Sequence, residues 1–198
     1  MSVFQVTTFD INIQDVSVCE RELKNRLGVD RDFDVSVYRK ITETAFNNVQ
    51  PCCVYTKVPV KCTSDGICDL GFTAVKSHDL CKNLKGCSSA FVFAVTLGIQ
   101  AQRHLLTLSK TSQSSHFICD AYYNALAEAV CDKAEGIIKG SLVCKPRFSP
   151  GYGDLPLEIQ RDVLNVLDAA KTAGICLTDS LLMTPQKSIT AIMGIKDS

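Results

Sequence analysis

The chain has 198 residues, of which 46% are hydrophobic and 21% are charged, with 21 Lys and Arg against 21 Asp and Glu. This length and composition are typical of one or two globular domains and exclude a mainly disordered chain. A formal net charge of zero argues against recognition by bulk electrostatics, so neither nucleic acid nor a membrane surface is an expected partner.

No segment predicts membrane insertion or export. The longest apolar stretch, residues 90–99, is about half the length of a membrane-spanning helix. Residues 1–10 lack the basic and apolar regions of a signal peptide, so we expect a cytoplasmic protein. In that compartment the 11 cysteines are expected to be reduced structural thiols, and the absence of a C-x-x-C spacing predicts no metal site.

The N-terminal part predicts two helices. Asp15 is a candidate N-cap for the first helix, and Gly28 can end it in a left-handed conformation. A second helix is expected from Asp34 until Pro51 interrupts it. The first helix should bury a stripe formed by Val16, Cys19, Leu23 and Leu27.

The pattern then changes to that of strands. Residues 54–60 alternate with period two, and a turn at residues 63–66 leads to a second extended run at 70–75, which predicts a hairpin. Ser77 caps a short helix that closes at Gly86. Residues 90–97 are continuously apolar, as expected for a strand buried on both faces, and form the best candidate for a central strand.

The remaining elements are two helices and a strand. Residues 116–138 predict a long amphipathic helix, Leu155-Pro156 opens another that ends at Gly174, and residues 188–195 alternate as a strand. The fold class is α+β, a mixed or antiparallel sheet with flanking helices. We expect a single unit over residues 1–198, with a helical part at 1–50 and an α+β core at 51–198.

Familiar catalytic signatures do not occur, and His78, His104 and His116 are scattered along the chain. We expect His104 to be a solvated surface residue rather than a base.

The loop at residues 147–154 (RFSPGYGD) carries the clearest indication of binding. Arg147 offers a rigid fork of donors that matches a carboxylate, and Pro150 fixes one backbone angle. Gly151 permits close approach of a ligand to the main chain, and Tyr152 supplies a ring and a hydroxyl. The alternative is a loop whose arginine pairs with a nearby Asp and whose tyrosine packs on the core.

Residues 147–152 resemble the R-P-x-P-G-Y motif of the activation, or reactivation, domain of cobalamin-dependent methionine synthase. Two further segments are similar to the same family in the same order. Residues 124–129 (NALAEA) match its L-A-E-A helix, and residues 177–188 (LTDSLLMTPQKS) match its L-T-E-S-x-x-M-x-P-x-x-S stretch. The likeness covers the C-terminal half well and the N-terminal half by length and order.

This resemblance implies the α+β fold of that domain and a role in rescue. In the family, the domain presents S-adenosylmethionine (SAM) for reductive methylation of cob(II)alamin, while flavodoxin or another donor supplies one electron. No D-x-H-x-x-G cobalamin-binding motif occurs here, so the cobalamin is expected on a partner methionine synthase chain. The chain is then expected to be a methionine synthase component that is inactive alone.

The same resemblance assigns roles to nine residues. Arg147 would hold the SAM carboxylate, Ser149 would contact SAM through its backbone, and Gly151 and Tyr152 would shape the pocket beside Pro150. The remaining four match by position, with Glu128 as the helix glutamate that borders the site: Glu128, Ser180, Pro185 and Ser188. Phe148 replaces the family's first proline, so the start of the loop is expected to be less rigid.

Two other functions stay open at this point. One is a SAM-binding or small-molecule sensor protein that acts without a corrin partner. The other is a thiol or metal-redox protein, for which the evidence is the 11 cysteines.

Overall fold

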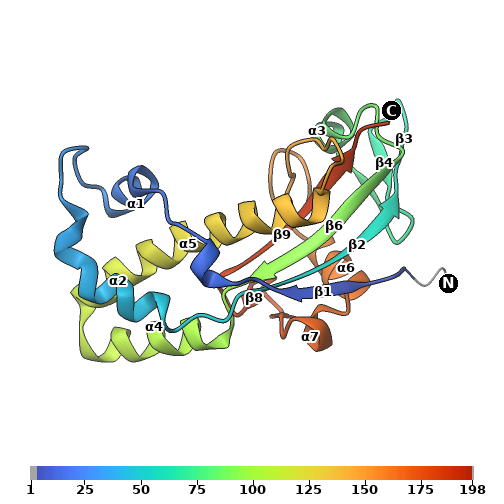
Figure 1. Cartoon of the computed structure of the whole chain (residues 1–198). Coiled ribbons are helices and arrows are strands. Elements are labelled where there is room, and N and C mark those ends of the chain that lie inside the picture. The colour runs from blue at the N-terminus through green and yellow to red at the C-terminus, as the bar shows by residue number, and fades with distance from the viewer. Residues whose placement is uncertain (1–3, 198) are drawn as a thin grey trace.

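The computed structural model describes residues 4–197, so residues 1–3 and 198 of the expected unit lie outside the described residues. Its centre is a four-stranded antiparallel sheet with the order β1-β2-β6-β9 (Figure 1). The strands are β1 (Thr7–Asp10), β2 (Cys52–Pro59), β6 (Ser89–Thr96) and β9 (Ser188–Ile195). Strand β6 pairs along its whole length with both β2 and β9, which confirms the predicted central strand.

The residues of β6 explain its central position. Phe91, Phe93 and Val95 belong to the core on one face of the sheet, and Val92 and Ala94 belong to the core on the other. All five are buried, because successive side chains of a strand point to opposite faces and both faces are covered.

Four α-helices cover the first face. They are α1 (Glu20–Leu27), α2 (Arg39–Phe46), α4 (Ile99–Thr111) and α5 (Gln113–Lys139). Helix α5 contacts the sheet and also α1, α2 and α4, which gather at one end of it (Figure 1). Two short 3-10 helices, η1 (Ile13–Asp15) and η2 (Val35–Tyr38), precede α1 and α2.

The second face carries smaller elements. They are the helices α3 (His78–Asn83), α6 (Ile159–Val166) and α7 (Ala169–Thr172), and the strands β3 (Lys61–Cys62), β4 (Ile67–Asp69) and β5 (Ala74–Lys76), which form a three-stranded sheet. A two-stranded ribbon joins β7 (Cys176–Leu177) to β8 (Met183–Thr184). The hairpin predicted around residues 63–66 is therefore the β3–β4 turn, and the predicted cap Ser77 accepts a hydrogen bond from Leu80 N.

Two predicted helix starts and one predicted core residue are wrong. Asp15 lies in η1 rather than capping α1, and Cys19 immediately precedes α1 and is exposed, so it is not part of the buried stripe. Helix α6 begins at Ile159 rather than at Leu155, because the Leu155 carbonyl accepts from Gly151 N and closes a turn there. Gly28 does end α1, with a left-handed φ of 67°.

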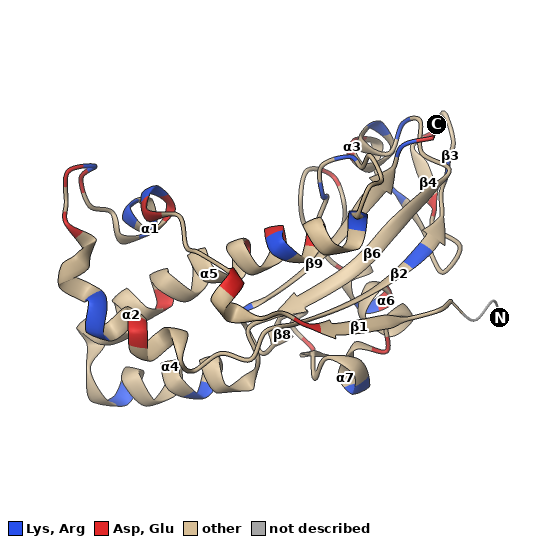
Figure 2. Ribbon diagram, viewed as in Figure 1, with Lys and Arg blue, Asp and Glu red and all other residues tan. Residues whose placement is uncertain are grey.

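Strand β1 has no counterpart among the predicted elements. It pairs antiparallel with β2, so the N-terminal part contributes an outer strand to the sheet as well as helices. No helix within residues 4–197 is long and apolar enough to cross a bilayer. Basic and acidic residues are distributed over both ends of the molecule (Figure 2).

The other outer strand, β9, is covered by the segment that leads into the 147–154 loop. Cys144 and Phe148 form isolated bridges with Ile195 and Ile192. These bridges place Arg147, the residue before Phe148, beside the sheet and opposite α5.

Candidate functional site

A cavity of about 380 Å³ lies between α5, β9, α6 and the 147–154 loop. This volume falls in the range of about 300–1,000 Å³ that is typical of small-molecule sites. Six of the nine predicted site residues line it: Glu128, Arg147, Ser149, Pro150, Tyr152 and Ser188. The structure therefore brings together residues from three segments that are far apart in the sequence.

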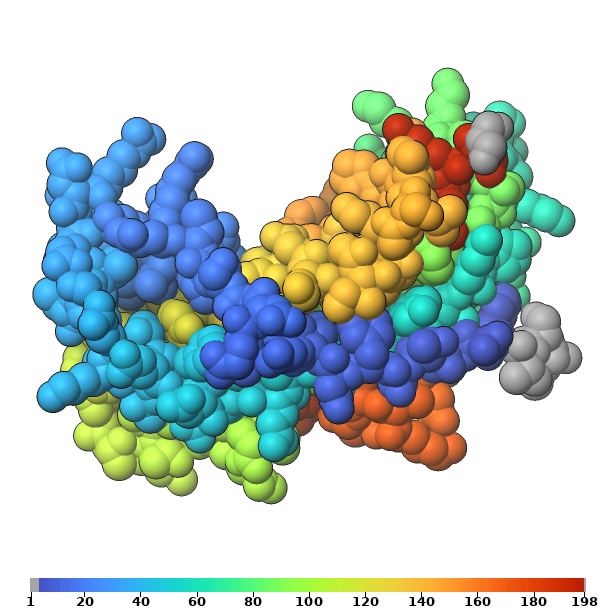
Figure 3. Space-filling view, in the orientation of Figure 1, coloured from blue at the N-terminus to red at the C-terminus, as the bar shows by residue number. Residues whose placement is uncertain are grey.

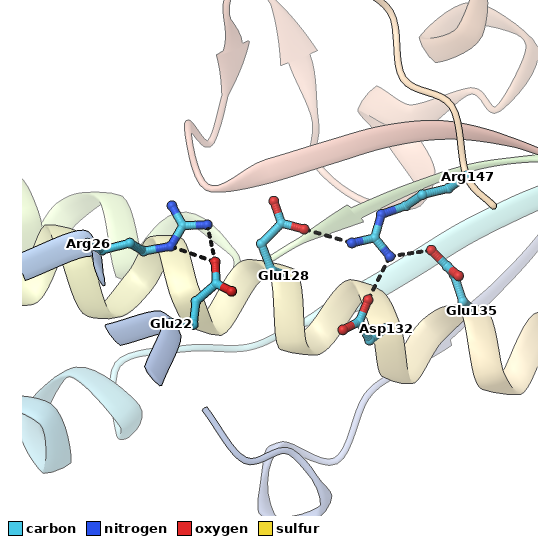
Figure 4. Close-up of polar contacts among 6 residues, drawn as sticks. All are labelled: Glu22, Arg26, Glu128, Asp132, Glu135 and Arg147. Carbon is cyan, nitrogen blue, oxygen red and sulfur yellow. Dashed lines mark hydrogen bonds and ion pairs between the residues drawn. The ribbon is translucent and has the colours of Figure 1, made fainter. Parts of the chain in front are cut away.

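Arg147 is the most highly connected side chain of the site (Figure 4). Its Nη2 donates to Glu128 Oε2 at 2.8 Å, and its Nη1 donates to Asp132 Oδ1 at 2.6 Å and also to Glu135 Oε1. The arginine side chain is 26% exposed, against 41% for Glu128 and 18% for Glu135. The predicted alternative, an arginine paired with a nearby Asp, is present as the contact with Asp132, and two glutamates add to it.

The three carboxylates belong to one face of α5. Glu128, Asp132 and Glu135 are spaced by four and three residues, which places them in a row along a helix. One arginine among three carboxylates leaves a formal charge of +1 − 3 = −2 on this cluster. The acidic row favours a ligand that brings positive charge.

Arg147 keeps donors that the cluster does not use. Three of its five N–H groups donate to the carboxylates, and its Nε–H and one Nη2–H have no partner among residues 4–197. Burial alone lowers the pKa of the guanidinium, but the hydrogen bonds that it donates to Glu135 and Asp132 outweigh burial and hold the pKa above its ordinary value. Arg147 is therefore a permanent cation with capacity for a further acceptor.

The start of the loop is held by backbone hydrogen bonds. Phe148 N donates to Ile192 O at 2.8 Å, and Ile192 N donates to Phe148 O at 2.9 Å. A proline at position 148 could not donate the first of these bonds. Phe148, where the motif that the loop resembles has a proline, therefore provides a direct link to β9 in place of a fixed backbone angle.

The middle of the loop turns sharply. Gly151 has a φ of 85°, a conformation that favours glycine, and Tyr152 N donates to Ser149 O at 3.1 Å. Gly151 does not line the cavity, so its role here is to form the turn. Tyr152 lines the cavity and is 68% exposed, rather than packed on the core.

The end of the loop is anchored to α3. The carboxylate of Asp154 accepts from the Ser77 hydroxyl and from His78 N and Asp79 N. The hydrogen bond from Ser77 is the largest cause that lowers the pKa of Asp154, and the two backbone donors act in the same direction. An ionised Asp154 therefore fixes the loop to the first turn of α3.

The three predicted site residues of the 177–188 segment contribute unequally to the cavity. Ser188 is buried and lines the cavity, but its hydroxyl donates to Pro185 O at 2.7 Å and lies 2.8 Å from Thr96 Oγ1. Pro185 is buried and does not line the cavity. Ser180 is exposed, and its hydroxyl lies 3.0 Å from Thr178 Oγ1. These residues shape the turn before β9, and Ser188 alone of the three reaches the site.

Sequence reasoning missed two buried polar residues of the cavity. Gln160 is 5% exposed and Thr190 is 3% exposed, and the Thr190 hydroxyl donates to Gln160 Oε1 at 3.1 Å. Gln160 precedes Leu164 by four residues and Leu167 by seven, so the helical pattern places a polar side chain on the inward face. That conflict between polarity and position was the available signal.

Other chemically reactive groups lie apart from the cavity. The prediction of a solvated His104 is wrong, because its ring is partly buried between α4 and α5, with Nδ1 2.9 Å from Tyr123 Oη. Burial lowers the pKa of His104. Each of the 11 cysteines is a free thiol, and Cys62, Cys68 and Cys81 lie close together on the second face of the sheet.

Of three comparisons with known proteins, the one with solved structures found a match. A scan of protein-family models and a search of curated proteins found none. Among solved structures, the chain is similar to the MetH reactivation domain bound to AdoHcy (S-adenosylhomocysteine), with a TM-score of 0.72 and 14% identity. The superposition covers 98% of this chain and 79% of that chain.

The chain has the fold of the MetH reactivation domain. This confirms the predicted fold class, helices around an antiparallel sheet. The coverage extends the likeness from the C-terminal motifs to the N-terminal half, including β1 and the first two helices. At 14% identity the likeness establishes the fold.

Proposed function

We propose that this chain binds SAM in the cavity between α5 and the 147–154 loop. The observation that carries the proposal is the convergence of Glu128, Arg147 and Tyr152 on one cavity, in a fold whose structural neighbour binds AdoHcy. AdoHcy is what remains of SAM after its methyl group has been transferred. The same cavity is therefore the natural place for the methyl donor.

The chemistry of the lining residues suits SAM. The two unused N–H groups of Arg147 can donate to the carboxylate of the ligand, and Glu128 can accept from its ammonium group. SAM carries one carboxylate, one ammonium and one sulfonium, and so has a net charge of +1. The acidic cluster around Arg147, with its formal charge of −2, complements that charge.

We propose further that the bound SAM serves the reactivation of a cobalamin-dependent methionine synthase whose corrin is carried by a partner chain. One-electron reduction of cob(II)alamin by a flavodoxin-like or other donor makes the cobalt nucleophilic enough to take the methyl group of SAM, with AdoHcy as the leaving group. The sulfonium is already activated, so this chain needs to position it rather than to supply a general base. No His or Asp, and no Glu other than Glu128, is among the described residues that line the cavity, which agrees with that role.

The surface beside the cavity offers a place for such a partner. A groove of about 360 Å³ runs between α1 and α5, and Glu128 and Asp132 line it. Figure 3 shows a hollow above α5, between the N-terminal helices and the segment around residue 150. We propose that the corrin approaches through this hollow, because Glu128 borders both the groove and the SAM cavity.

Two measurements test the proposal in order. Calorimetry with the purified chain should detect SAM binding. The chain should then restore methylcobalamin and homocysteine methylation to a cob(II)alamin-loaded methionine synthase that lacks its own reactivation domain, given SAM and a one-electron reductant. Omission of either the chain or SAM should abolish recovery. Binding without recovery would favour the sensor function, and absence of binding would overturn the site.

A further inference from the structure

Three cysteine thiols meet on the second face of the sheet, away from the proposed SAM cavity. They are Cys62 in β3, Cys68 in β4 and Cys81 in α3, and their sulfur atoms all lie within 4.8 Å of one another. Cys62 Sγ and Cys68 Sγ are 3.5 Å apart. Cys68 is fully buried, Cys81 is partly buried and Cys62 is exposed, so the cluster lies at the surface with one side toward solvent.

The topology that assembles them is specific. Cys62 and Cys68 are direct partners in the register of the β3–β4 hairpin. Helix α3 is tied to the same hairpin because Ser77 N, at its N-cap, donates to Gly66 O at 2.8 Å. The positions of the three thiols are therefore determined by the register of a hairpin and by the position of a helix, rather than by their spacing along the chain.

We propose that Cys62, Cys68 and Cys81 bind a zinc ion as a three-thiolate site. Thiolates are the preferred ligands of Zn²⁺, and with a Zn–S bond of about 2.3 Å the sulfurs of a tetrahedral site lie about 3.8 Å apart. The observed separations, 3.5 Å for one pair and at most 4.8 Å for the others, bracket that value. Binding exchanges the three S–H protons for one metal ion and changes no oxidation state.

A fourth position remains on the solvent side of the three sulfurs. A water molecule can take it. His78, one helical turn before Cys81, is not among the residues whose ligand atoms lie within 4.8 Å of one another. The His78 ring already packs on Gly66, in the turn that joins Cys62 to Cys68, because a Cβ on Gly66 would lie 2.5 Å from His78 Nδ1. Asp154 of the 147–154 loop caps the same helix. The ion would therefore join the hairpin to the helix that anchors the loop.

The experiment uses the full chain, purified anaerobically and freed of reductant and metal. Titration with Zn²⁺ against a chromophoric chelator should give about one equivalent bound, and Co²⁺ should give sulfur-to-cobalt charge-transfer absorption. Cys62→Ser and Cys81→Ser should weaken zinc binding at least tenfold. The matched controls are Cys176→Ser, exposed like Cys62, and Cys144→Ser, partly buried like Cys81, and both should bind as the wild type does.

A second readout separates metal binding from a folding defect. Zinc should raise the Tm of the wild type and of both controls, but not the Tm of Cys62→Ser. Without zinc, Cys62→Ser should have the same Tm as the wild type, because the Cys62 side chain is exposed. The proposal is wrong if the wild type binds no zinc or if Cys62→Ser binds it equally. None of these results depends on SAM binding.

Discussion

Replacement of Arg147 by Ala tests the centre of the proposed SAM site, and its first effect should be on stability. The change removes three ion pairs whose acidic partners are 41%, 69% and 18% exposed. Exposed pairs contribute about 0–1 kcal/mol each, because solvent screens them. We therefore expect a total loss of about 1–2 kcal/mol, most of it from Glu135, the least exposed partner. For a chain of this size the Tm should fall by about 2–8 °C.

The second effect should be on ligand affinity and should be larger. A hydrogen bond from a charged donor to the ligand carboxylate is worth about 1.5–3 kcal/mol. Calorimetry should therefore show SAM binding weakened about ten- to a hundredfold in Arg147→Ala. Arg147→Lys should recover part of the loss, since it restores the charge but not the planar fork.

The control for this prediction is Arg161→Ala. Arg161 is an exposed residue of α6 outside the cavity lining, so its removal makes the same change in net charge. It should leave SAM affinity unchanged. If folded Arg147→Ala binds SAM as tightly as the wild type, Arg147 only forms ion pairs with α5. The assignment of Arg147 to the SAM carboxylate is then refuted. An equal loss in Arg161→Ala would point to overall charge instead.

The remaining predictions concern charge, backbone conformation and pH. SAM should bind about two- to fivefold more tightly than AdoHcy, because only SAM brings a sulfonium to the acidic cluster. Calorimetry should show that this difference in affinity becomes smaller as the salt concentration rises. Gly153→Ala should lower the free energy of unfolding by about 1–3 kcal/mol, because the φ of Gly153 is 53°. Gly136 lies in a helix with open space around it, so Gly136→Ala should raise the free energy of unfolding by about 1 kcal/mol. Denaturant unfolding measures both changes. The pKa of Asp154 is lowered from 3.8, so its ionised form stabilises the fold above that pH and the benefit is lost as pH falls through the lower folded value. The Tm advantage of the wild type over Asp154→Asn should thus be present at pH 7 and shrink below about pH 4; a gap independent of pH would contradict this.

The elements that could be predicted from sequence are those whose burial leaves a local pattern. Strand β6 was predicted because residues 90–97 are continuously apolar, as expected for a strand buried on both faces. Helix α5 was predicted because its apolar residues recur at the period of a helix. Strand β1 was not, because its four residues are mostly exposed and show no alternation. Its strand conformation comes from pairing with β2, more than 40 residues later, which no local pattern records.

The same distinction applies to the two sites. The loop around Arg147 could be identified because turn-forming residues and an arginine are adjacent in the sequence. Its acidic partners Asp132 and Glu135 could not, since the pairing depends on how the loop docks against β9 and faces α5. The cluster of three cysteines could not be predicted for a similar reason. Cys62 and Cys81 are 19 positions apart in the sequence and are brought together by a hairpin and a helix, which no spacing along the chain records.

The anchoring of the loop suggests why the cavity can be ready for its ligand before the ligand arrives. Phe148 fixes the start of the loop to β9 by two backbone hydrogen bonds, and Asp154 fixes its end to α3. Arg147 is meanwhile held against α5 by carboxylates whose helix is rigidly packed on the sheet. Binding to such a site requires little further ordering of the protein, which leaves more of the interaction energy for affinity. For the proposed methyl transfer, which depends on the position of one methyl group, an arrangement fixed at three points serves better than a flexible loop with the same side chains.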